Sequence, residues 1–309
     1  MADKIATRAA YGKTLVKLGE SEKNLIVMDA DLSKSTMTAE FAKAYPERFF
    51  NMGIAEQNLY GTAAGLALSG KTVCASTFAM FASGRAFEII RNSIGYTGAN
   101  VKVCATHAGI TVGEDGASHQ TFEDIALMRT IPGMTVVNPC DAVSAEKLLE
   151  QVIGFKGPAY VRLGRAAVPV FYNEEDSVTI GKANVLREGR DVTVIATGIM
   201  VSEAMMAASQ LAEEGVDVGV IDMHTIKPLD EEAVINAAKT TGRIVTAEEH
   251  SVIGGLGSAV AEVTSKYCPV RIEMVGQHDT YGESGKPEEL KEKYGMTAAD
   301  IVKAVREVY

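Results

Sequence analysis

Short apolar runs alternate with longer amphipathic runs along most of the chain. The apolar runs hold consecutive Val, Ile, Leu and Ala residues, which is typical of buried strands of a parallel sheet. Between them, apolar residues recur at helical spacing, and Asp141 stands where a helix N-cap would be. In the N-terminal half the pattern predicts strands at 25–30, 72–77, 101–107, 134–139 and 159–165, and helices near 38–45, 79–93 and 141–153.

The same rhythm restarts after a polar, acidic stretch at 171–182 that has no periodicity. Strands alternating with helices predict an α/β protein with mostly parallel sheets flanked by helices. A chain of 309 residues suggests two domains of ordinary size. We expect a first domain at 1–172, a linker at 173–188 and a second domain at 189–309. The predicted strands of the second half are 192–198, 216–223, 243–249 and 269–276, and its helices are 201–215, 229–242, 255–267 and a pair within 286–309.

Composition narrows the possible partners. The net charge of −10 argues against nucleic acid and anionic membranes, since both attract basic surfaces. No uncharged run reaches the ~20 residues that a membrane-spanning helix needs, and the N-terminal residues do not resemble a signal peptide. The four cysteines fit no metal-ligand spacing. We therefore expect a reduced, cytoplasmic protein without a metal site of its own.

A single carboxylate, Glu56, stands at the head of an uncharged segment of small and apolar residues that ends at Gly70. Gly61 and Gly65 form a G-x-x-x-G pattern, which lets another element approach this predicted helix closely. A first-turn acid favours the helix dipole, and that alone would explain Glu56. A carboxylate kept from water instead needs a partner or a proton, and could exchange a proton with a ring nitrogen. Both interpretations remain open.

Two further stretches hold candidate chemistry. Phe78 and Phe81 are three residues apart, so at helical spacing they share a face, either for core packing or as a wall for a flat heterocycle. The densest polar stretch, 106–120, carries two histidines and two acids among three glycines. Their spacing fits no known metal site, so contacts to a polar substrate are the better interpretation. Residues 29–36 and Arg165 follow predicted strands, where parallel sheets bind ligands.

Taken together, these stretches resemble transketolase. "GIAEQN" before the small-residue helix, then "STFAMF" and "GEDGASHQ", occur here in the order and spacing of that family. The resemblance runs from Arg8 to the C-terminus and corresponds to the second half of transketolase. It implies a pyrimidine-binding domain with the thiamine-diphosphate-binding fold, followed by the transketolase C-terminal domain.

The resemblance also implies site residues. Glu56 matches the catalytic glutamate that hydrogen-bonds N1′ of the thiamine diphosphate aminopyrimidine and helps to activate the cofactor. The other implied roles are an aromatic wall for the pyrimidine (Phe78 and Phe81), an acid near the thiazolium (Asp31), contacts to substrate hydroxyls near the reacting carbons (Asp115 and the catalytic His119) and a sugar-phosphate grip (Arg8, Ser35, His107 and Arg165).

The sequence departs from the family in two places. Gly84, followed by Arg85, stands where transketolases often have a Tyr, so the pyrimidine pocket is finished differently. The G-D-G…N signature that binds Mg²⁺ and the diphosphate is missing. The resemblance therefore implies the C-terminal subunit of a split transketolase of the pentose phosphate pathway, which transfers a two-carbon ketol unit between sugar phosphates. We expect it to be active only in a heterotetramer with an N-terminal subunit that carries G-D-G…N and ligates Mg²⁺.

Four alternatives stay open at this point. The β subunit of a 2-oxo acid dehydrogenase has the same domain order and also lacks the diphosphate half. A deoxyxylulose-phosphate-synthase-like enzyme shares the first chemical step but normally carries both halves on one chain. A non-catalytic assembly subunit could keep the fold, although Glu56 and the histidines are present. A metal-dependent hydrolase is the remaining possibility.

Overall fold

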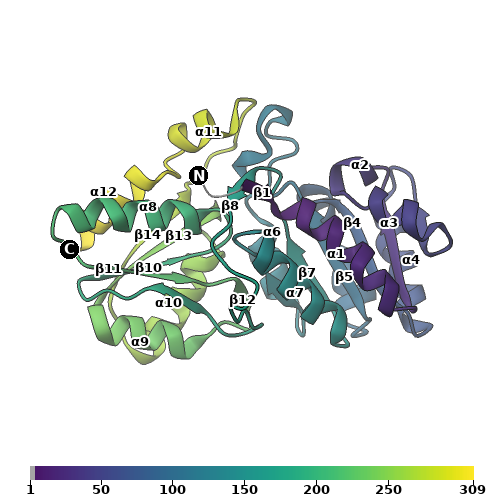
Figure 1. The fold of residues 1–309 in the computed structure, drawn as a ribbon, viewed down its shortest axis with the longest axis horizontal. Coiled ribbons are helices and arrows are strands. Elements are labelled where there is room, and N and C mark those ends of the chain that lie inside the picture. Colours follow the sequence, from purple (N-terminus) through teal and green to yellow (C-terminus); the bar gives the residue numbers. More distant parts are fainter. Residues whose placement is uncertain (1–3) are drawn as a thin grey trace.

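The apolar runs of the N-terminal half form the centre of a seven-stranded sheet with the order β12-β6-β7-β5-β4-β2-β3 (Figure 1). The computed structural model describes residues 4–309. Neighbouring strands are parallel except for β12 and β6. Every residue of β2 and β5 is buried, because helices cover both faces of the sheet. The strands are β2 (Leu25–Asp29), β3 (Phe49–Asn51), β4 (Thr72–Phe78), β5 (Val101–Thr106), β6 (Thr135–Val137), β7 (Ala159–Arg162) and β12 (Thr225–Lys227).

The predicted helices of this half are present, except that the single helix expected at 79–93 is wrong. Three helices were not predicted, at Thr7–Ser21, Ser33–Thr36 and Asp124–Thr130. Around α5 (Phe87–Ile89), residues Phe81–Arg85 and Ile90–Gly95 form π-helical turns. The amide of Ala86, for example, donates to the Phe81 carbonyl oxygen, five residues back, at 3.3 Å. The other helices are α1 (Thr7–Ser21), α2 (Ser33–Thr36), α3 (Ala39–Ala44), α4 (Glu56–Leu68), α6 (Asp124–Thr130) and α7 (Ala142–Gly154).

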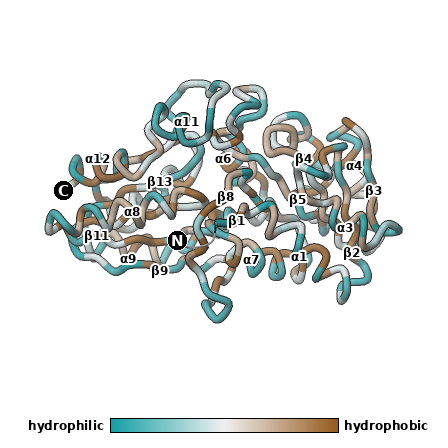
Figure 2. The backbone as a smooth tube through the Cα atoms, turned by 45° about the horizontal axis from the view of Figure 1, so that its top comes forward, coloured by the Kyte–Doolittle hydropathy of each residue, from teal (hydrophilic) through white to brown (hydrophobic). Residues whose placement is uncertain are grey.

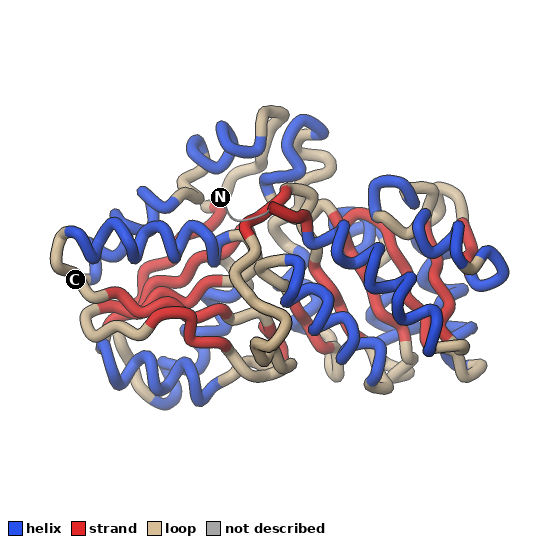
Figure 3. Tube along the Cα trace, in the orientation of Figure 1, coloured by secondary structure: helices blue, strands red, loops and turns tan. Residues whose placement is uncertain are grey.

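The second half contains a five-stranded sheet with the order β14-β13-β10-β11-β9. Its strands are parallel except for β9, which pairs antiparallel with β11. Helices again lie on both faces, as Figure 3 shows. The strands are β9 (Asn184–Arg187), β10 (Val192–Ala196), β11 (Val218–Asp222), β13 (Arg243–Ser251) and β14 (Arg271–Gln277), and the helices are α8 (Met200–Glu213), α9 (Glu231–Thr241), α10 (Leu256–Tyr267), α11 (Pro287–Lys293) and α12 (Ala298–Val308).

The expected domain limits stay a prediction. The first three residues of the expected first domain lie outside the described residues, and β9 lies inside the expected linker at 173–188. Hydrophobic residues follow the strands of both sheets, and hydrophilic residues gather in the connecting loops (Figure 2). This distribution agrees with two buried sheets, and both large hydrophobic clusters contain residues of both halves.

Several contacts join the two halves. β12 belongs to the C-terminal half of the chain but pairs with β6 of the first sheet. α11 packs against a 3₁₀ segment of the first half, η4 (Ile110–Asp115). Gln120 Nε2 donates to the Glu283 carbonyl oxygen at 2.9 Å. Within the first half, β1 (Lys4–Ala6) and β8 (Ala167–Pro169) form a separate two-stranded sheet. The second half therefore supports the polar loop that contains η4.

Candidate functional site

The predicted site residues lie at the carboxyl ends of the central strands of the first sheet. Asp31 follows β2, Phe78 ends β4, His107 follows β5 and Arg165 follows β7. Asp31 and His107 have φ angles of 65° and 58°, in the left-handed region that residues other than glycine seldom adopt. Backbone conformations of this kind persist where the surrounding structure imposes them, and they cluster at functional sites. We therefore expect a ligand to bind at the carboxyl ends of these strands.

Glu56 is the first residue of α4, and its side chain is only 3% exposed. Arg85 Nη1 lies 3.2 Å from Glu56 Oε1 and 3.1 Å from Oε2. The Arg85 side chain is 53% exposed, and its guanidinium carbon lies 4.9 Å from the centroid of the Phe81 ring. The Arg85 guanidinium therefore contacts both the Glu56 carboxylate and the Phe81 ring, and the place that it occupies beside them is here called the Glu56–Phe81 space.

The rings of Phe78 and Phe81 stack, with centroids 6.0 Å apart and planes at 12°. The reason given for this from the sequence is wrong, because Phe78 ends strand β4 and only Phe81 lies in a helical turn. The rings meet because the chain turns between these two elements. His107 stacks on Phe78 with centroids 3.8 Å apart, and His119 meets the Phe81 ring edge-on at 5.2 Å. These four rings form one cluster.

His107 is neutral. Its ring is buried, and burial together with the charges of Arg8 and Arg165 and with His119 lowers the pKa to about 3. Arg8 Nη1 lies 3.3 Å from His107 Nε2, and an arginine can only donate, so Nε2 is the acceptor. The ring proton is then on Nδ1, which donates to Thr106 Oγ1 at 2.9 Å. This assignment follows from the hydrogen-bond partners.

Three of the four residues expected to bind a phosphate contact one another: Arg8, Ser35 and His107. In addition to its contact with His107, Arg8 Nη1 donates to the backbone oxygen of Ser35 at 2.7 Å, so Ser35 contributes its carbonyl here and not its hydroxyl. Arg165 instead donates to the Val112 carbonyl oxygen and to Glu114 Oε2, the latter at 2.8 Å. Burial and the nearby charge of Arg165 lower the pKa of Arg8. Two cations that face the same region are suited to bind an anion.

Asp31 and Asp115, the two predicted aspartates, are exposed. Asp31 Oδ1 accepts from Asn51 Nδ2 at 3.3 Å, and Asp115 lies at the end of η4. The neighbouring Asp29 is fully buried, where it accepts from the Leu32 amide and the Thr36 hydroxyl, both at 2.6 Å, and from the Thr38 hydroxyl at 2.9 Å. Burial raises the pKa of Asp29, and these hydrogen bonds oppose that rise. Asp29 therefore holds the turn that carries the predicted site residues 31 and 35.

Two supporting groups were not found from the sequence. Arg85 was noticed only as a departure from the family, although its place four residues after Phe81 was visible. Glu249, from β13 of the second half, accepts from the Thr111 amide at 2.6 Å. A Cβ at Gly109, whose φ is 79°, would lie 2.2 Å from the Glu249 carboxyl carbon, so this position requires glycine. No sequence pattern links residues so far apart.

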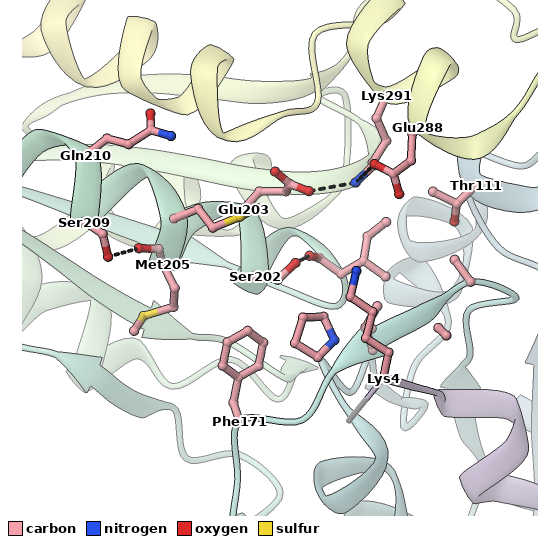
Figure 4. Close-up of a pocket in the computed structure, with 16 residues that line it drawn as sticks. Lys4, Thr111, Phe171, Ser202, Glu203, Met205, Ser209, Gln210, Glu288 and Lys291 are labelled. Carbon is pink, nitrogen blue, oxygen red and sulfur yellow. Dashed lines mark hydrogen bonds and ion pairs between the residues drawn. The ribbon is translucent and has the colours of Figure 1, made fainter. Parts of the chain in front are cut away.

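A cavity of about 590 Å³ lies between α8, α11 and the strand β8 (Figure 4). Phe171, Met205 and Met206 supply apolar wall. At its charged end, Lys291 Nζ lies 2.7 Å from Glu203 Oε1 and 2.8 Å from Glu288 Oε2. None of the predicted site residues lines this cavity.

Gly61 and Gly65 of α4 are both exposed, and a Cβ built on either would meet no atom of the described residues within 4 Å. Leu68, one turn further along the same face, is 64% exposed. Across residues 4–309, His, Cys, Asp and Glu side chains form no group of three or more that could hold a metal ion. No helix in the described part of the chain has the length and apolar character needed to cross a bilayer.

Two family models together match most of the chain. Residues 3–170 match "Transketolase, pyrimidine binding domain", and residues 181–301 match "Transketolase, C-terminal domain". The chain is 51% identical to the putative transketolase C-terminal section of Methanocaldococcus jannaschii, over 97% of this chain and 95% of that protein. It is 44% identical to the 6-deoxy-6-sulfo-D-fructose transketolase subunit SqwH of a Clostridium species, over 97% and 94%.

Similar structures agree with these matches. A structure described as "Split gene transketolase, inactive beta4 tetramer" is 55% identical, with a TM-score of 0.93 over 98% of each chain. Human transketolase is 38% identical over 99% of this chain, which spans only 49% of the human protein. The predicted fold, with two mostly parallel α/β domains, is confirmed. The roles of the individual site residues stay predictions.

Proposed function

Since the chain belongs to the transketolase family, we propose that it is the C-terminal subunit of a split transketolase, which transfers a two-carbon ketol unit between sugar phosphates. The observation that carries this proposal is the Glu56–Phe81 space, where a buried carboxylate and an aromatic face border one site in a chain half the length of human transketolase. Membership in this family favours the proposal over a 2-oxo acid dehydrogenase subunit.

The residues present fit the pyrimidine end of thiamine diphosphate. The space already holds a flat, nitrogen-bearing group that donates to Glu56 and stacks near Phe81, and an aminopyrimidine has the same character. When bound, this cofactor supplies an electron sink for breaking and forming carbon–carbon bonds next to a carbonyl. Glu56 would hold the proton at the ring nitrogen N1′, and the stacked Phe78 and Phe81 rings would orient the ring and exclude water.

The substrate contacts follow from the same sheet edge. Arg8 and Arg165 would bind the anionic end of the sugar, with the neutral His107 ring beside them. His119 and Asp115 would contact hydroxyl groups near the reacting carbons. One relative is named as a 6-deoxy-6-sulfo-D-fructose transketolase subunit, and that sugar carries a sulfonate in place of a phosphate. A sulfonate and a phosphate make similar demands on two arginines, so the anion itself is the feature that these residues select.

A separate N-terminal subunit would complete the site. The sequence lacks G-D-G…N, so Mg²⁺ and the diphosphate would be held by that subunit. The exposed stripe of Gly61, Gly65 and Leu68 on α4 is the surface we assign to contacts between subunits. The solved relative described as an inactive β4 tetramer supports self-association of such a chain without its partner.

Replacing Glu56 tests the proposal. In the complex with the partner subunit, Glu56→Ala should lower ketol transfer by a factor of roughly 10²–10⁴, the usual contribution of an acid–base group. Thiamine diphosphate should still bind, because its other contacts remain. The direct readout is the exchange rate of the C2 proton of the bound cofactor, followed by NMR. Exchange at the rate of the unsubstituted complex would remove Glu56 from its assigned role.

A further inference from the structure

The Arg85 guanidinium lies where the two proposed pyrimidine contacts meet. Its Nη1 is within 3.2 Å of both Glu56 oxygens, and its central carbon is 4.9 Å from the Phe81 ring centroid. We propose that Arg85 is a displaceable plug, which occupies the aminopyrimidine place in the chain without cofactor and withdraws when thiamine diphosphate binds. This inference rests on the proposed function.

The guanidinium resembles the ring that it would replace. It is planar and delocalised, it presents N–H donors in its plane to a carboxylate, and it stacks on aromatic faces. An aminopyrimidine makes the same two contacts, with a ring nitrogen toward Glu56 and a flat face toward Phe81. Both groups cannot occupy the Glu56–Phe81 space at once. Cofactor binding therefore requires Arg85 to move.

In the chain without cofactor, Arg85 neutralises the charge of a buried carboxylate. A carboxylate that is 3% exposed is costly to leave without a counter-charge, and Arg85 supplies one. The Arg85 side chain is itself 53% exposed, so water competes for it and the pair is weak enough to exchange. The same chain contains a pair that could not exchange in this way. Arg162 and Asp124 are 3% and 0% exposed, and Asp124 also accepts from the Tyr160 hydroxyl.

The local backbone allows the side chain to move while its own peptide stays in place. Gln57 Nε2 donates to the Arg85 carbonyl oxygen at 3.3 Å, which ties this residue to the helix that carries Glu56. Arg85 is the last residue of the π-helical turn that begins at Phe81, and turns of this kind occur frequently at functional sites. The side chain can then turn toward solvent without a shift of α4.

The test compares two arginine variants in the complex with the partner subunit. Arg85→Gln removes the plug, while Arg91→Gln is a matched control, because Arg91 is an exposed residue whose side chain, among residues 4–309, donates only to Asn92, at 2.6 Å. Isothermal titration calorimetry with thiamine diphosphate and Mg²⁺ gives the dissociation constant. We expect it to fall about two- to tenfold in Arg85→Gln, the size of a partly exposed ion pair, and to stay unchanged in Arg91→Gln. Equal or weaker binding by Arg85→Gln would overturn the plug.

A second measurement does not involve the cofactor. In the single chain, Arg85→Gln should lower the melting temperature by leaving the Glu56 carboxylate buried without its cation. Adding Glu56→Gln should recover part of that loss, so the double-mutant cycle should show coupling. Additive effects would contradict the plug. If the unsubstituted complex bound no thiamine diphosphate at all, the proposed function would fail and the plug with it, an outcome distinct from unaltered binding by Arg85→Gln.

Discussion

His107 joins the two parts of the candidate site. Its ring stacks on Phe78 at 3.8 Å, and its Nε2 accepts from Arg8 at 3.3 Å. The residue therefore links the aromatic cluster, which we assign to the cofactor, with the cations that we assign to the substrate anion. From the sequence, His107 was a candidate for contact with a polar substrate, and its role in binding a phosphate was implied only by a resemblance, since its partners lie far away in the chain. Arg85 shows the reverse case, because it was visible as a departure but nothing in the sequence said what it contacts.

The depressed pKa of His107 predicts a pH dependence of stability. Its pKa is about 3 in the folded chain and ordinary, near 6.5, in the unfolded chain. Between these values only the unfolded chain binds the proton. The contribution of His107 to the free energy of unfolding is therefore fully present above pH 6.5 and is lost as the pH decreases toward 3. The loss from this residue should reach about 2 kcal/mol at pH 5.

Urea unfolding of the single chain at pH 7 and pH 5 measures this loss. His107→Gln should lose about 2 kcal/mol less between the two pH values than the unsubstituted chain. His224, whose pKa is lowered to about 4 by burial, adds a loss of the same sign to both proteins and serves as the background. An equal loss in both proteins would show that His107 does not titrate as described.

Arg165 predicts how the substrate anion is bound. Arg165→Ala should raise the KM for a sugar phosphate roughly tenfold to a hundredfold, because a charged hydrogen bond contributes ~1.5–3 kcal/mol. The KM for hydroxypyruvate, which has no phosphate, should change little. Glu114→Gln is the matched control, since it removes the partner that now pairs with Arg165 at 2.8 Å. If the KM values for the sugar phosphate and for hydroxypyruvate rise equally, Arg165 has a structural role alone.

At the scale of elements, periodicity predicted the central strands well and failed where packing is unusual. Helix α1 buries Thr7, Ala10, Tyr11, Thr14 and Leu15, which have helical spacing but include polar and small side chains, so no apolar stripe is visible. The π-helical turns at 81–95 carry the apolar residues of an ordinary helix, and only the three-dimensional contacts of Phe81 and Arg85 distinguish them. The strands β9 and β12 are too short to show a periodic pattern, and they form through pairing with β11 and β6. These features require tertiary contacts that a single sequence does not display.

A substitution on the uncovered face of α4 should impair subunit assembly without impairing folding. Gly65→Leu adds a side chain where no atom lies within 4 Å, and it replaces a helical glycine, so the melting temperature of the single chain should stay equal or rise. Association with the partner subunit should weaken strongly, because the added side chain occupies the contact surface. Analytical ultracentrifugation measures the assembly. Gly154→Leu, at another exposed glycine with no atom within 4 Å, is the control. Normal assembly of Gly65→Leu would remove α4 from the interface.

At the scale of the whole molecule, the second half holds the site of the first half in place. Glu249 fixes the loop at Thr111, and α11 packs against η4. The site itself lies at a sheet edge, with the stripe of Gly61, Gly65 and Leu68 exposed on the helix that begins at Glu56. Helix α4 thus carries both Glu56, the proposed pyrimidine contact, and a candidate subunit surface, which is the arrangement expected of a subunit that contributes half of a site.

The most direct measurement is a coupled ketol-transfer assay on the highly purified single chain, with thiamine diphosphate and Mg²⁺ in excess. We expect no turnover from this chain alone. Activity should appear when a separate chain of similar size that carries G-D-G…N is added, and it should saturate near a one-to-one ratio. Robust turnover from the single chain, with no partner detectable by mass spectrometry, would contradict the proposal that this chain is one subunit of a split transketolase.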